Sequence, residues 1–423
     1  MVPNSAQGSE SEPSTGGKKT SDRICLKKHF MKTVQYVDEV EIRDKKVLIR
    51  VDFDVSLNPD HSIANDVRIK QNIPTLKYLL NNNNRLICIA KLNRPKTRDP
   101  GHSLKPVVKR LREYLVDYKI TLVDDFLTCD PKIFKDQKPN EILVLENIRF
   151  YPQEKDYSTL FAKRLASLAD VYVNDGFAVS HRTDTSVIGP PKYIPGYGGL
   201  LLKKELEMLS RIIKNPAKPT VAIIGGAKVS TKIGLVNKLV KIVDFLIIGG
   251  GLANTFVCAQ GHEVGTSFCE YEAVQQARKL LALAKGNRAH IVLPVDAVVA
   301  SSKDDKETEV VKIENIPPKK SIFDIGPETK AQIGCILASA KTIIWNGPVG
   351  YFENPAFRRG TDFIYYSIAH NKEAVSIVGG GDTLSAISNK EYLDKITHIS
   401  TGGGAMLEFI EKGTLPGIEA LKR

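Results

Sequence analysis

The stretch Ala222-Ile223-Ile224-Gly225-Gly226-Ala227-Lys228 joins a short apolar, β-branched run to a pair of glycines. The same pattern returns four times, in residues 246–251, 343–348, 376–382 and 399–404. Short continuous apolar runs are typical of buried parallel strands. Glycines at their carboxyl ends let a ligand approach the backbone and leave amide groups free to bind anions. Because ligands of open α/β sheets bind at that edge, the second half of the chain is predicted to hold a phosphate-rich molecule such as a nucleotide.

The first half alternates expected strands with amphipathic helices. The strands are expected at 47–54, 85–91, 120–125, 141–146 and 170–174, and the helices at 73–80, 104–115 and 158–168. This βαβ rhythm predicts a second parallel, doubly wound sheet. Residues 200–214 (LLLKKELEMLSRIIK) repeat apolar side chains at helical spacing and end at Asn215-Pro216, which predicts a helix between two domains.

The length of 423 residues exceeds that of one ordinary core and favours two domains. The expected fold class is therefore α/β, with two doubly wound, parallel-sheet (Rossmann-like) domains. Residues 1–30 are rich in Ser, Gly, Lys and Pro and are expected to form a disordered extension. The acidic residues Glu10, Glu12 and Asp22 and the lack of an apolar core argue against a targeting peptide there.

The bulk composition narrows the partners. The formal charge of +12 is spread through the chain without an aromatic-basic RNA signature, which disfavours nucleic acid as a partner. No apolar stretch is long enough to span a bilayer, so no membrane partner is expected. The six cysteines include no CxxC pair, which favours free thiols in a reducing compartment over a zinc site or a disulfide framework.

Basic residues of the first half fall mostly near the ends of the expected strands. They are Arg50, Arg68, Lys91, Arg94, Arg149 and Arg182. Guanidinium groups bind phosphate and carboxylate bidentately, so several at one sheet edge predict a pocket for a small anion with more than one charged group. Asp52 and Asp54 share one side of their strand. We interpret them as anchors for the arginines or acceptors for a substrate hydroxyl; an acid/base pair or a metal site is disfavoured because no His or Glu cluster accompanies them.

Two lysines follow the first glycine pair. Lys228 and Lys232 are four residues apart, so on a helix they would share a face and both could meet phosphate oxygens. The GxxxxGK[ST] spacing of a P-loop is absent, which disfavours a P-loop kinase. A GxGxxG match at 249–254 fails at its last position, which leaves a dehydrogenase as a distant option.

Acidic residues follow two later glycine clusters. Asp382, after the glycines 379–381, is expected to hold Mg²⁺ beside phosphates or to cap a helix with Thr383. Glu353 is a candidate acceptor for a ribose hydroxyl. The eight histidines do not cluster, and the chain shows no triad or HExxH motif. This inventory suits phosphoryl transfer, which depends mainly on positioning and charge stabilisation.

Taken together, the motifs resemble the phosphoglycerate kinase family from about Met31 to the C-terminus. The matching segments are RVDFDV (50–55), NRPK (93–96), LENIRF (145–150), YVNDGF (172–177), GGAKVSTKI (225–233), WNGPVGYFE (345–353), GGGDT (379–383) and STGGGAMLE (400–408). The resemblance implies a cytoplasmic, monomeric glycolytic enzyme that transfers a phosphoryl group reversibly between 1,3-bisphosphoglycerate and ADP, giving 3-phosphoglycerate and ATP. Transfer would be direct and in line, with Mg²⁺ accompanying ATP or ADP, after closure about a hinge helix.

The resemblance also implies domain boundaries. An acid-substrate domain would span residues 31–199, the interdomain helix 200–214 and a nucleotide-binding domain 215–404. Residues 405–423 would return to the N-terminal domain.

Family roles carry over to matching positions. The acid substrate would meet Asp52, Asp54, Arg68, Lys91, Arg94, Arg149 and Arg182. The catalytic set would be Arg68, Lys228, Gly402 and Gly403. The nucleotide would meet Gly226, Lys232, Gly250, Asn346, Pro348, Glu353, Gly380, Asp382 and Thr383, with Asp382 on the metal.

Six positions depart from the family pattern. Where the family has Asn, Pro, His, Gly, His and Asp, this chain has Asp54, Ser56, Lys91, Asn93, Asp184 and Thr231. Asp54 and Asp184 add negative charge near an anionic substrate, while Lys91 restores a positive one. An active enzyme is preferred because the phosphate-holding motifs are largely intact. The alternatives are a divergent nucleotide-binding paralogue with reduced or lost catalysis and, on charge alone, a nucleic-acid binder.

Overall fold

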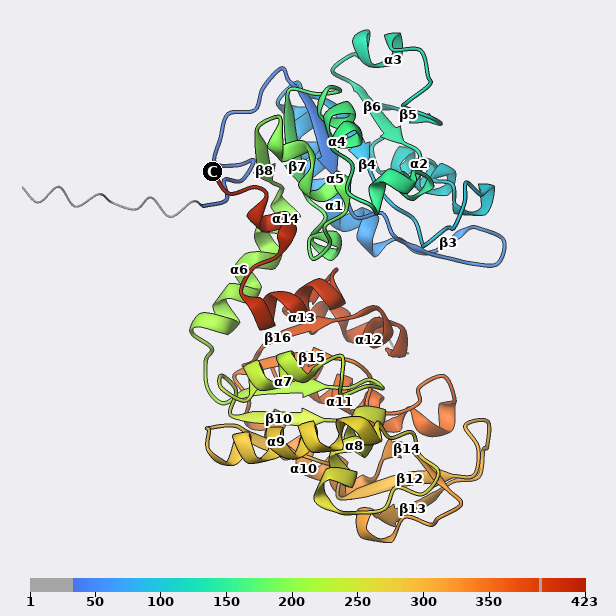
Figure 1. Ribbon diagram of the computed structural model, residues 1–423, viewed down its shortest axis with the longest axis vertical. Helices are drawn as coiled ribbons and strands as arrows, with labels where there is room; N and C mark the ends of the chain where they lie inside the picture. Colours follow the sequence, from blue (N-terminus) through green and yellow to red (C-terminus); the bar gives the residue numbers. More distant parts are fainter. Residues whose placement is uncertain (1–32, 388–389) are drawn as a thin grey trace, which may run out of the picture. The chain divides into compact units, whose positions relative to one another are not determined.

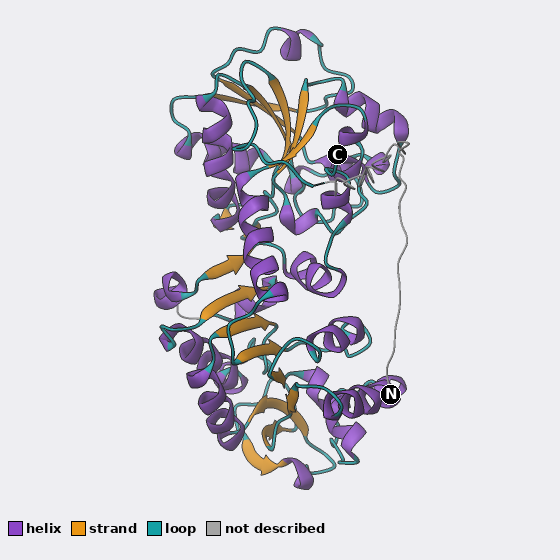
Figure 2. Cartoon of the chain, turned by 90° about the vertical axis from the view of Figure 1, so that its left-hand side faces the viewer, coloured by secondary structure: helices purple, strands orange, loops and turns teal. Residues whose placement is uncertain are grey.

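The computed structural model describes residues 33–387 and 390–423 (Figure 1). The expected extension at 1–30 lies outside the described residues. Two six-stranded parallel sheets organise the chain, and helices lie on both sides of each (Figure 2). The predicted α/β class with two doubly wound parallel sheets is therefore confirmed.

The N-terminal sheet has the strand order β5-β6-β4-β1-β7-β8, and every neighbouring pair is parallel. Its strands are β1 (Lys46–Arg50), β4 (Arg85–Ile89), β5 (Lys119–Val123), β6 (Glu141–Leu145), β7 (Val171–Asn174) and β8 (Gly196–Gly198). Alternate residues of β1 enter different apolar cores: Leu48 packs in one, and Val47 and Ile49 in the other. Both faces are thus buried, which explains the continuous apolar runs of these strands.

Helices and a small hairpin complete this half. The helices are α1 (Val67–Asn81), α2 (Lys105–Tyr114), α3 (Lys132–Lys135), α4 (Thr159–Ala166) and α5 (Thr185–Ile188). The hairpin pairs β2 (Ser56–Leu57) with β3 (Ile63–Asn65). Short 3₁₀ turns follow several strands, among them η4 (Phe177–Val179) after β7.

The C-terminal sheet has the order β11-β10-β9-β15-β16-β17, again all parallel. Its strands are β9 (Thr220–Ile224), β10 (Phe245–Ile248), β11 (His290–Val292), β15 (Thr342–Asn346), β16 (Val375–Gly379) and β17 (His398–Ser400). The five glycine-ended runs are five adjacent strands of this sheet, so their glycines meet at one edge. Its helices are α7 (Ile233–Leu239), α8 (Gly251–Gln260), α9 (Val274–Lys285), α10 (Pro327–Ser339), α11 (Arg359–His370) and α12 (Gly381–Ala386).

A three-stranded antiparallel sheet, which the sequence did not predict, accompanies the C-terminal sheet. It has the order β13-β12-β14 and consists of β12 (Asp296–Ala300), β13 (Glu309–Lys312) and β14 (Ser321–Ile325). Each strand is too short to give a clear pattern of alternation by itself.

The helix expected at 200–214 is present as α6 (Leu200–Lys214). Its first turn is held by Asp175, which follows β7 and whose Oδ1 accepts from the amides of Leu201 (2.9 Å) and Leu202 (3.2 Å). Further along, the buried Glu205 accepts from the Thr401 amide (2.7 Å) and hydroxyl (2.9 Å). The helix is therefore hydrogen-bonded to one segment that follows β7 of the N-terminal sheet and to another that follows β17 of the C-terminal sheet. Its action as a hinge stays a prediction.

The chain ends with α13 (Gly403–Lys412) and α14 (Pro416–Glu419). The Gly417 amide donates to the Ser180 carbonyl at 2.8 Å, and Ile418 packs in the same apolar core as Leu48 of β1. Among the described residues, none of the helices combines the length and apolar character needed to cross a membrane.

Candidate active site

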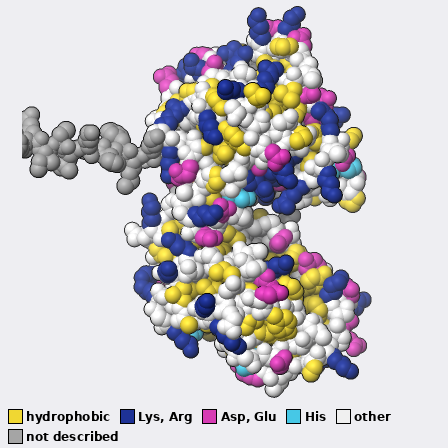
Figure 3. Space-filling view, in the orientation of Figure 1, with side chains coloured by type: hydrophobic (Ala, Val, Ile, Leu, Met, Phe, Trp, Pro, Cys, Tyr) yellow, Lys and Arg dark blue, Asp and Glu magenta, His cyan; other side chains and the backbone are white. Residues whose placement is uncertain are grey.

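Four cations from the N-terminal sheet line one cavity of about 420 Å³, here called the charged cavity. Arg68 comes from α1, Lys91 and Arg94 from the segment after β4, and Arg182 from the segment after η4. Figure 3 shows a dense group of Lys and Arg side chains on this part of the chain. The predicted convergence of cations is observed for these four, although Arg68 comes from the first turn of a helix and not from a strand end.

Arg68 is held by a buried carboxylate. Its Nη1 donates to Asp52 Oδ1 (2.9 Å) and Oδ2 (2.8 Å), and Asp52 is 1% exposed. The Asp52 charge raises the pKa of Arg68 further above its ordinary value. Asp52 does not line the cavity, so its geometry is that of an anchor for the arginine.

Lys91 and Asp54 form an ion pair in the wall of the charged cavity. Asp54 Oδ1 also accepts from the Asn93 amide at 2.7 Å, and Asn93 has a φ of 56°. Asparagine adopts that left-handed conformation more readily than most residues. Burial by itself would raise the pKa of Asp54, but the Lys91 ammonium and the two hydrogen bonds lower it below its ordinary value. Asp54 therefore stays ionised and its charge is neutralised locally.

Two of the six basic positions turn away from the charged cavity. Arg149 pairs with Asp184 at 2.5 Å, and both side chains are nearly buried. Arg50 is fully buried and donates from Nε to the Ser186 hydroxyl at 3.1 Å. Neither lines the cavity, but Arg149 lies close enough to Arg182 for its charge to help burial lower the pKa of that arginine.

The opposite wall of the charged cavity comes from the edge of the C-terminal sheet. It includes Gly226, Lys232, Asn346, Pro348, Gly380 and Thr383. Thr383 Oγ1 accepts from the Gly347 amide (2.7 Å) and donates to the Gly379 carbonyl (2.9 Å), while Asn346 Nδ2 donates to the same carbonyl (2.8 Å). These bonds tie the ends of β15 and β16 together.

Two glycines are required where α13 meets this edge. Gly380 has a φ of 108°, which disfavours any side chain. A Cβ on Gly403 would lie 2.4 Å from the Gly380 Cα, so only glycine permits this approach. Gly402 and Gly403, at the start of α13, consequently line the charged cavity with their backbone.

Lys228 and Lys232 do not lie on a helix, contrary to the expectation. Both precede α7 in a loop, so the prediction that they share a helix face is wrong. Gly226 has a φ of 116°, residues 226–232 form bends and turns, and α7 begins only at Ile233. Lys232 lines the charged cavity and donates to the Gly225 carbonyl, and burial lowers its pKa to about 8. Lys228 is exposed and lines neither this cavity nor the next.

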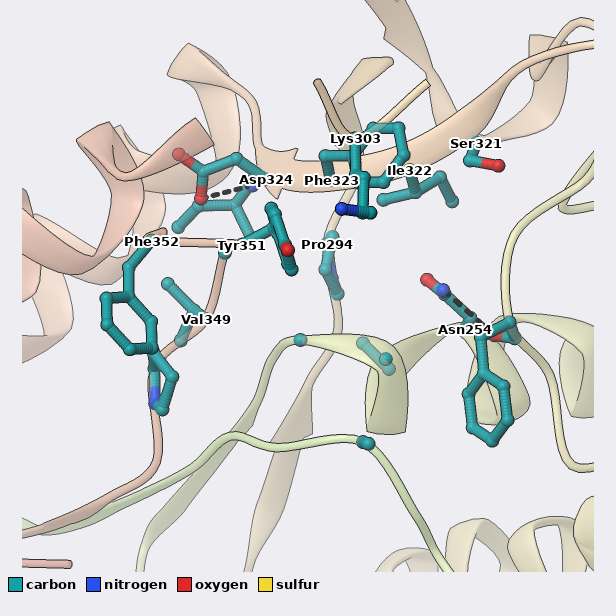
Figure 4. A pocket seen from close by; sticks show the side chains of 18 of the residues that line it. Asn254, Pro294, Lys303, Ser321, Ile322, Phe323, Asp324, Val349, Tyr351 and Phe352 are labelled. Carbon is teal, nitrogen blue, oxygen red and sulfur yellow. Dashed lines mark hydrogen bonds between the residues drawn. The ribbon is translucent and has the colours of Figure 1, made fainter. Parts of the chain in front are cut away.

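A second cavity of about 600 Å³, here called the aromatic cavity, adjoins the first (Figure 4). Its walls are Phe268, Phe323, Tyr351 and Phe352, with Asn254 of α8 on the far side from Phe352. The predicted residues Gly250 and Glu353 line it. Gly226, Pro348 and Asp382 line both cavities, so the two spaces meet at these residues.

The sequence did not predict that these aromatic residues and β14 would line a cavity. They come from the loop after α8, from β14 and from the segment after β15, and no local pattern links these segments. Tyr351 and Phe352 lie in the segment 345–353 that carries the family resemblance, and this was the available signal for two of the four aromatic residues. A large, mainly apolar space with a few polar groups suits the base and ribose of a nucleotide.

Asp382 is the one predicted metal ligand, and its position fits a magnesium ion that arrives with phosphates. Magnesium keeps several waters and binds through one or two carboxylates plus phosphate oxygens. Among the residues that the structure describes, no group of three or more His, Cys, Asp or Glu side chains could hold a metal ion. A single carboxylate where the two cavities meet is enough for a magnesium ion whose other ligands are phosphate oxygens and waters.

Comparison with known proteins gives a family. The sequence profile of phosphoglycerate kinase matches residues 37–413. The chain is 43% identical over 392 residues to the phosphoglycerate kinase of Dictyoglomus turgidum. The alignment covers 92% of this chain and 99% of that protein. It is 40% identical over 395 residues to the cytosolic phosphoglycerate kinase of Nicotiana tabacum, with coverage of 92% and 98%.

A solved structure agrees with the sequence relatives. The phosphoglycerate kinase of Coxiella burnetii superposes with a TM-score of 0.81 at 38% identity, covering 92% of this chain and 98% of that one. The profile match contains both sheets and both cavities, and the structural match covers the same share of the chain as the sequence relatives do. The chain therefore belongs to the phosphoglycerate kinase family.

Proposed function

We propose that the charged cavity is where the reaction of the family takes place in this chain. The chain is a glycolytic kinase, a transferase that moves a phosphoryl group reversibly between 1,3-bisphosphoglycerate and ADP to give 3-phosphoglycerate and ATP. One observation carries the site assignment: cations from the N-terminal sheet face phosphate-binding glycines of the C-terminal sheet across one space. A cavity with both kinds of wall suits two anionic substrates that must exchange a phosphoryl group.

The acid substrate is assigned to the cationic wall. Arg68, Arg94 and Arg182 offer guanidinium groups to its phosphate and carboxylate. Asp52 fixes Arg68, and the pair of Asp54 with Lys91 fixes the turn that carries Arg94. Arg149, paired with Asp184, supports this wall from behind or joins it when the substrate binds.

The nucleotide is assigned to both cavities. Its base and ribose occupy the aromatic cavity, where Glu353 accepts from a ribose hydroxyl, and its phosphates reach the charged cavity past Gly226, Gly250 and Pro348. Lys232, Asn346, Gly380 and Thr383 form the phosphate end. Asp382 holds magnesium, which when bound neutralises charge on the transferring phosphates.

The transferring phosphoryl group is assigned to Arg68, Lys228 and the amides of Gly402 and Gly403. Amides at the start of α13 suit developing negative charge. Lys228 is exposed in this conformation, so its role requires closure, and α6 is the proposed hinge. A carboxylate oxygen of 3-phosphoglycerate then attacks the terminal phosphorus in line, and ADP leaves.

The domain plan and setting are proposed on the same basis. Residues 31–199 form the acid-substrate domain, 200–214 the interdomain helix, 215–404 the nucleotide domain and 405–423 the returning segment. The bond from the Gly417 amide to the Ser180 carbonyl supports the return. The family resemblance supports a cytoplasmic monomer whose partners are ATP or ADP and the two phosphoglycerates, without nucleic acid or membrane.

The test is formation of 1,3-bisphosphoglycerate from 3-phosphoglycerate and MgATP by the purified protein. We expect Arg94→Ala to raise the KM for 3-phosphoglycerate by at least about tenfold, because it removes a charge-assisted contact to the substrate. Lys96→Ala is the matched control, since Lys96 is exposed nearby and lines neither cavity. No turnover with MgADP binding intact would instead favour the divergent paralogue.

A further inference from the structure

Two cysteines that are separated by 11 positions lie with their sulfur atoms only 3.3 Å apart. Cys258 belongs to the last turn of α8, and Cys269 to the loop before the 3₁₀ turn η6 (Tyr271–Ala273). Both are free thiols and partly exposed. The sequence showed no CxxC pair, so this proximity is a product of the fold.

The segment that carries Cys269 is already bonded to α8 on both sides of the sulfur. Asn254 Nδ2 donates to the Phe268 carbonyl at 3.1 Å (Figure 4), and the Glu270 amide donates to Thr255 Oγ1 at 3.1 Å. The two thiols therefore face each other across a prearranged contact. A small approach of the two sulfurs is enough to join them, since a disulfide has an S–S distance of about 2.05 Å.

The same segment also touches both parts of the proposed nucleotide site. Phe268 lines the aromatic cavity, and a Cβ on Gly251 would lie 3.5 Å from its ring. The Glu270 carboxylate accepts from the Ser230 amide (3.0 Å) and hydroxyl (2.6 Å), in the loop that carries Lys228 and Lys232. A change at Cys269 therefore reaches a wall of the cavity through one neighbour and the lysine loop through the other.

We propose that Cys258 and Cys269 are a redox-responsive pair whose closure to a disulfide locks residues 268–270 to α8 and narrows the nucleotide cavity. Intracellular disulfides of this kind are usually transient and act as sensors. The narrowing at the nucleotide rests on the proposed function, whereas the closure of the disulfide does not.

The oxidant is a low-molecular-weight disulfide such as oxidised glutathione. The Cys269 sulfur, as thiolate, attacks one sulfur of the oxidant and releases one thiol; Cys258 then attacks the Cys269 sulfur and releases the second. Both protein S–H bonds are lost, one S–S bond forms, and the oxidant carries away two electrons and two protons as two thiols. Burial raises the pKa of Cys258, which disfavours its thiolate as the attacking group, and the balance of atoms and electrons is the same for either order of attack.

The first measurement is direct detection of the bond. The full chain is treated with oxidised glutathione, alkylated and digested with trypsin, which leaves both cysteines in one fragment, residues 242–278. Further cleavage after Glu263 separates the two cysteines, so the products stay joined only if the disulfide has formed. We expect joined products, released by reduction, in the wild type and in Cys335→Ser. Cys335 is an exposed free cysteine and serves as the matched control. Alkylation of both Cys258 and Cys269 after this treatment would overturn the proposal.

The second measurement is the effect on the nucleotide. We expect the oxidised wild type to show a KM for MgATP raised about threefold or more, because displacements near 1 Å beside a site are costly. The KM for 3-phosphoglycerate stays unchanged, and Cys258→Ser shows no response to the oxidant. A joined pair with an unchanged KM for MgATP would refute the narrowing. Absence of turnover in the reduced protein would count against the proposed function alone. The disulfide is detected by mass spectrometry of the peptides, which does not depend on enzyme activity.

Discussion

Lys232 should make nucleotide binding depend on pH between about 7 and 9. Its ammonium lines the charged cavity and donates to the Gly225 carbonyl. Burial lowers its pKa from the ordinary 10.5 to about 8, and Asp382 opposes the shift only in part. The free protein therefore loses this positive charge as the pH rises through about 8.

The size of the effect follows from linkage. With a pKa of about 8, Lys232 is about 90% protonated at pH 7 and about 10% protonated at pH 9. A bound phosphate favours the ammonium and returns the pKa toward its ordinary value. Binding at pH 9 must then take up about 0.9 proton, and the affinity falls about tenfold between pH 7 and pH 9, which is about 1.4 kcal/mol.

The assay is calorimetric titration with MgADP across pH 7 to 9 in buffers of different ionisation enthalpy. The terminal phosphate ionises near pH 6, so it contributes little in this range. Lys232→Arg keeps a charge at every pH and should bind with nearly constant affinity. Lys241→Arg, at an exposed lysine, should behave as the wild type does.

Two results would refute the reasoning. One is a wild-type affinity that does not change between pH 7 and pH 9, which would mean that Lys232 is not the phosphate partner or that its pKa is not depressed. The other is a pH dependence that persists unchanged in Lys232→Arg, which would assign the titration to another group.

Three further predictions concern transfer, metal and stability. Lys228→Ala should lower kcat by about 100- to 1,000-fold with the MgADP affinity unchanged, because an ammonium that meets the phosphoryl only on closure stabilises the transition state; unchanged turnover would remove it from the mechanism. Asp382→Asn should raise the free Mg²⁺ needed for half-maximal activity by at least about tenfold, and an unaltered requirement would place the metal elsewhere. Glu205→Ala should lower the free energy of unfolding by about 2–3 kcal/mol in urea titrations, since His398 (2.8 Å) and Thr401 lose a buried partner; a loss under about 0.5 kcal/mol would contradict this.

The fold could be predicted because its signals are local. The runs that became β9, β10, β15 and β16 are buried on both faces, and such strands are continuously apolar. The glycines mark the edge at which these strands end. The antiparallel β12–β14 sheet escaped prediction because β13 and β14 are partly exposed and none of its three strands ends at a glycine cluster, so the signal that marked the parallel strands is absent.

The site was predictable in composition but not in geometry. Arg50 and Arg94 both lie near strand ends in the sequence, yet Arg50 is fully buried and Arg94 is exposed in the cavity wall. Only packing decides between these outcomes. The prediction that Lys228 and Lys232 share a helix face failed because residues 226–232 form bends and turns and α7 begins only at Ile233. The contact of Cys258 with Cys269 depends on a loop that returns to α8, which no spacing rule reports.

The acidic residues Asp54 and Asp184 are among the departures that motivate the alternative of a divergent relative with reduced or lost catalysis. The residues around them argue against that alternative. Asp54 is paired with Lys91 and Asp184 with Arg149, so each added carboxylate has its own cation within a salt bridge. A carboxylate that is neutralised in this way adds little repulsion toward an anionic substrate. The lining of the charged cavity still holds more Lys and Arg side chains than Asp and Glu side chains. Asp54 moreover accepts from the Asn93 amide, which orders the turn that presents Arg94. Substitutions that keep the charge balance and order a substrate-facing arginine are those expected in a working kinase.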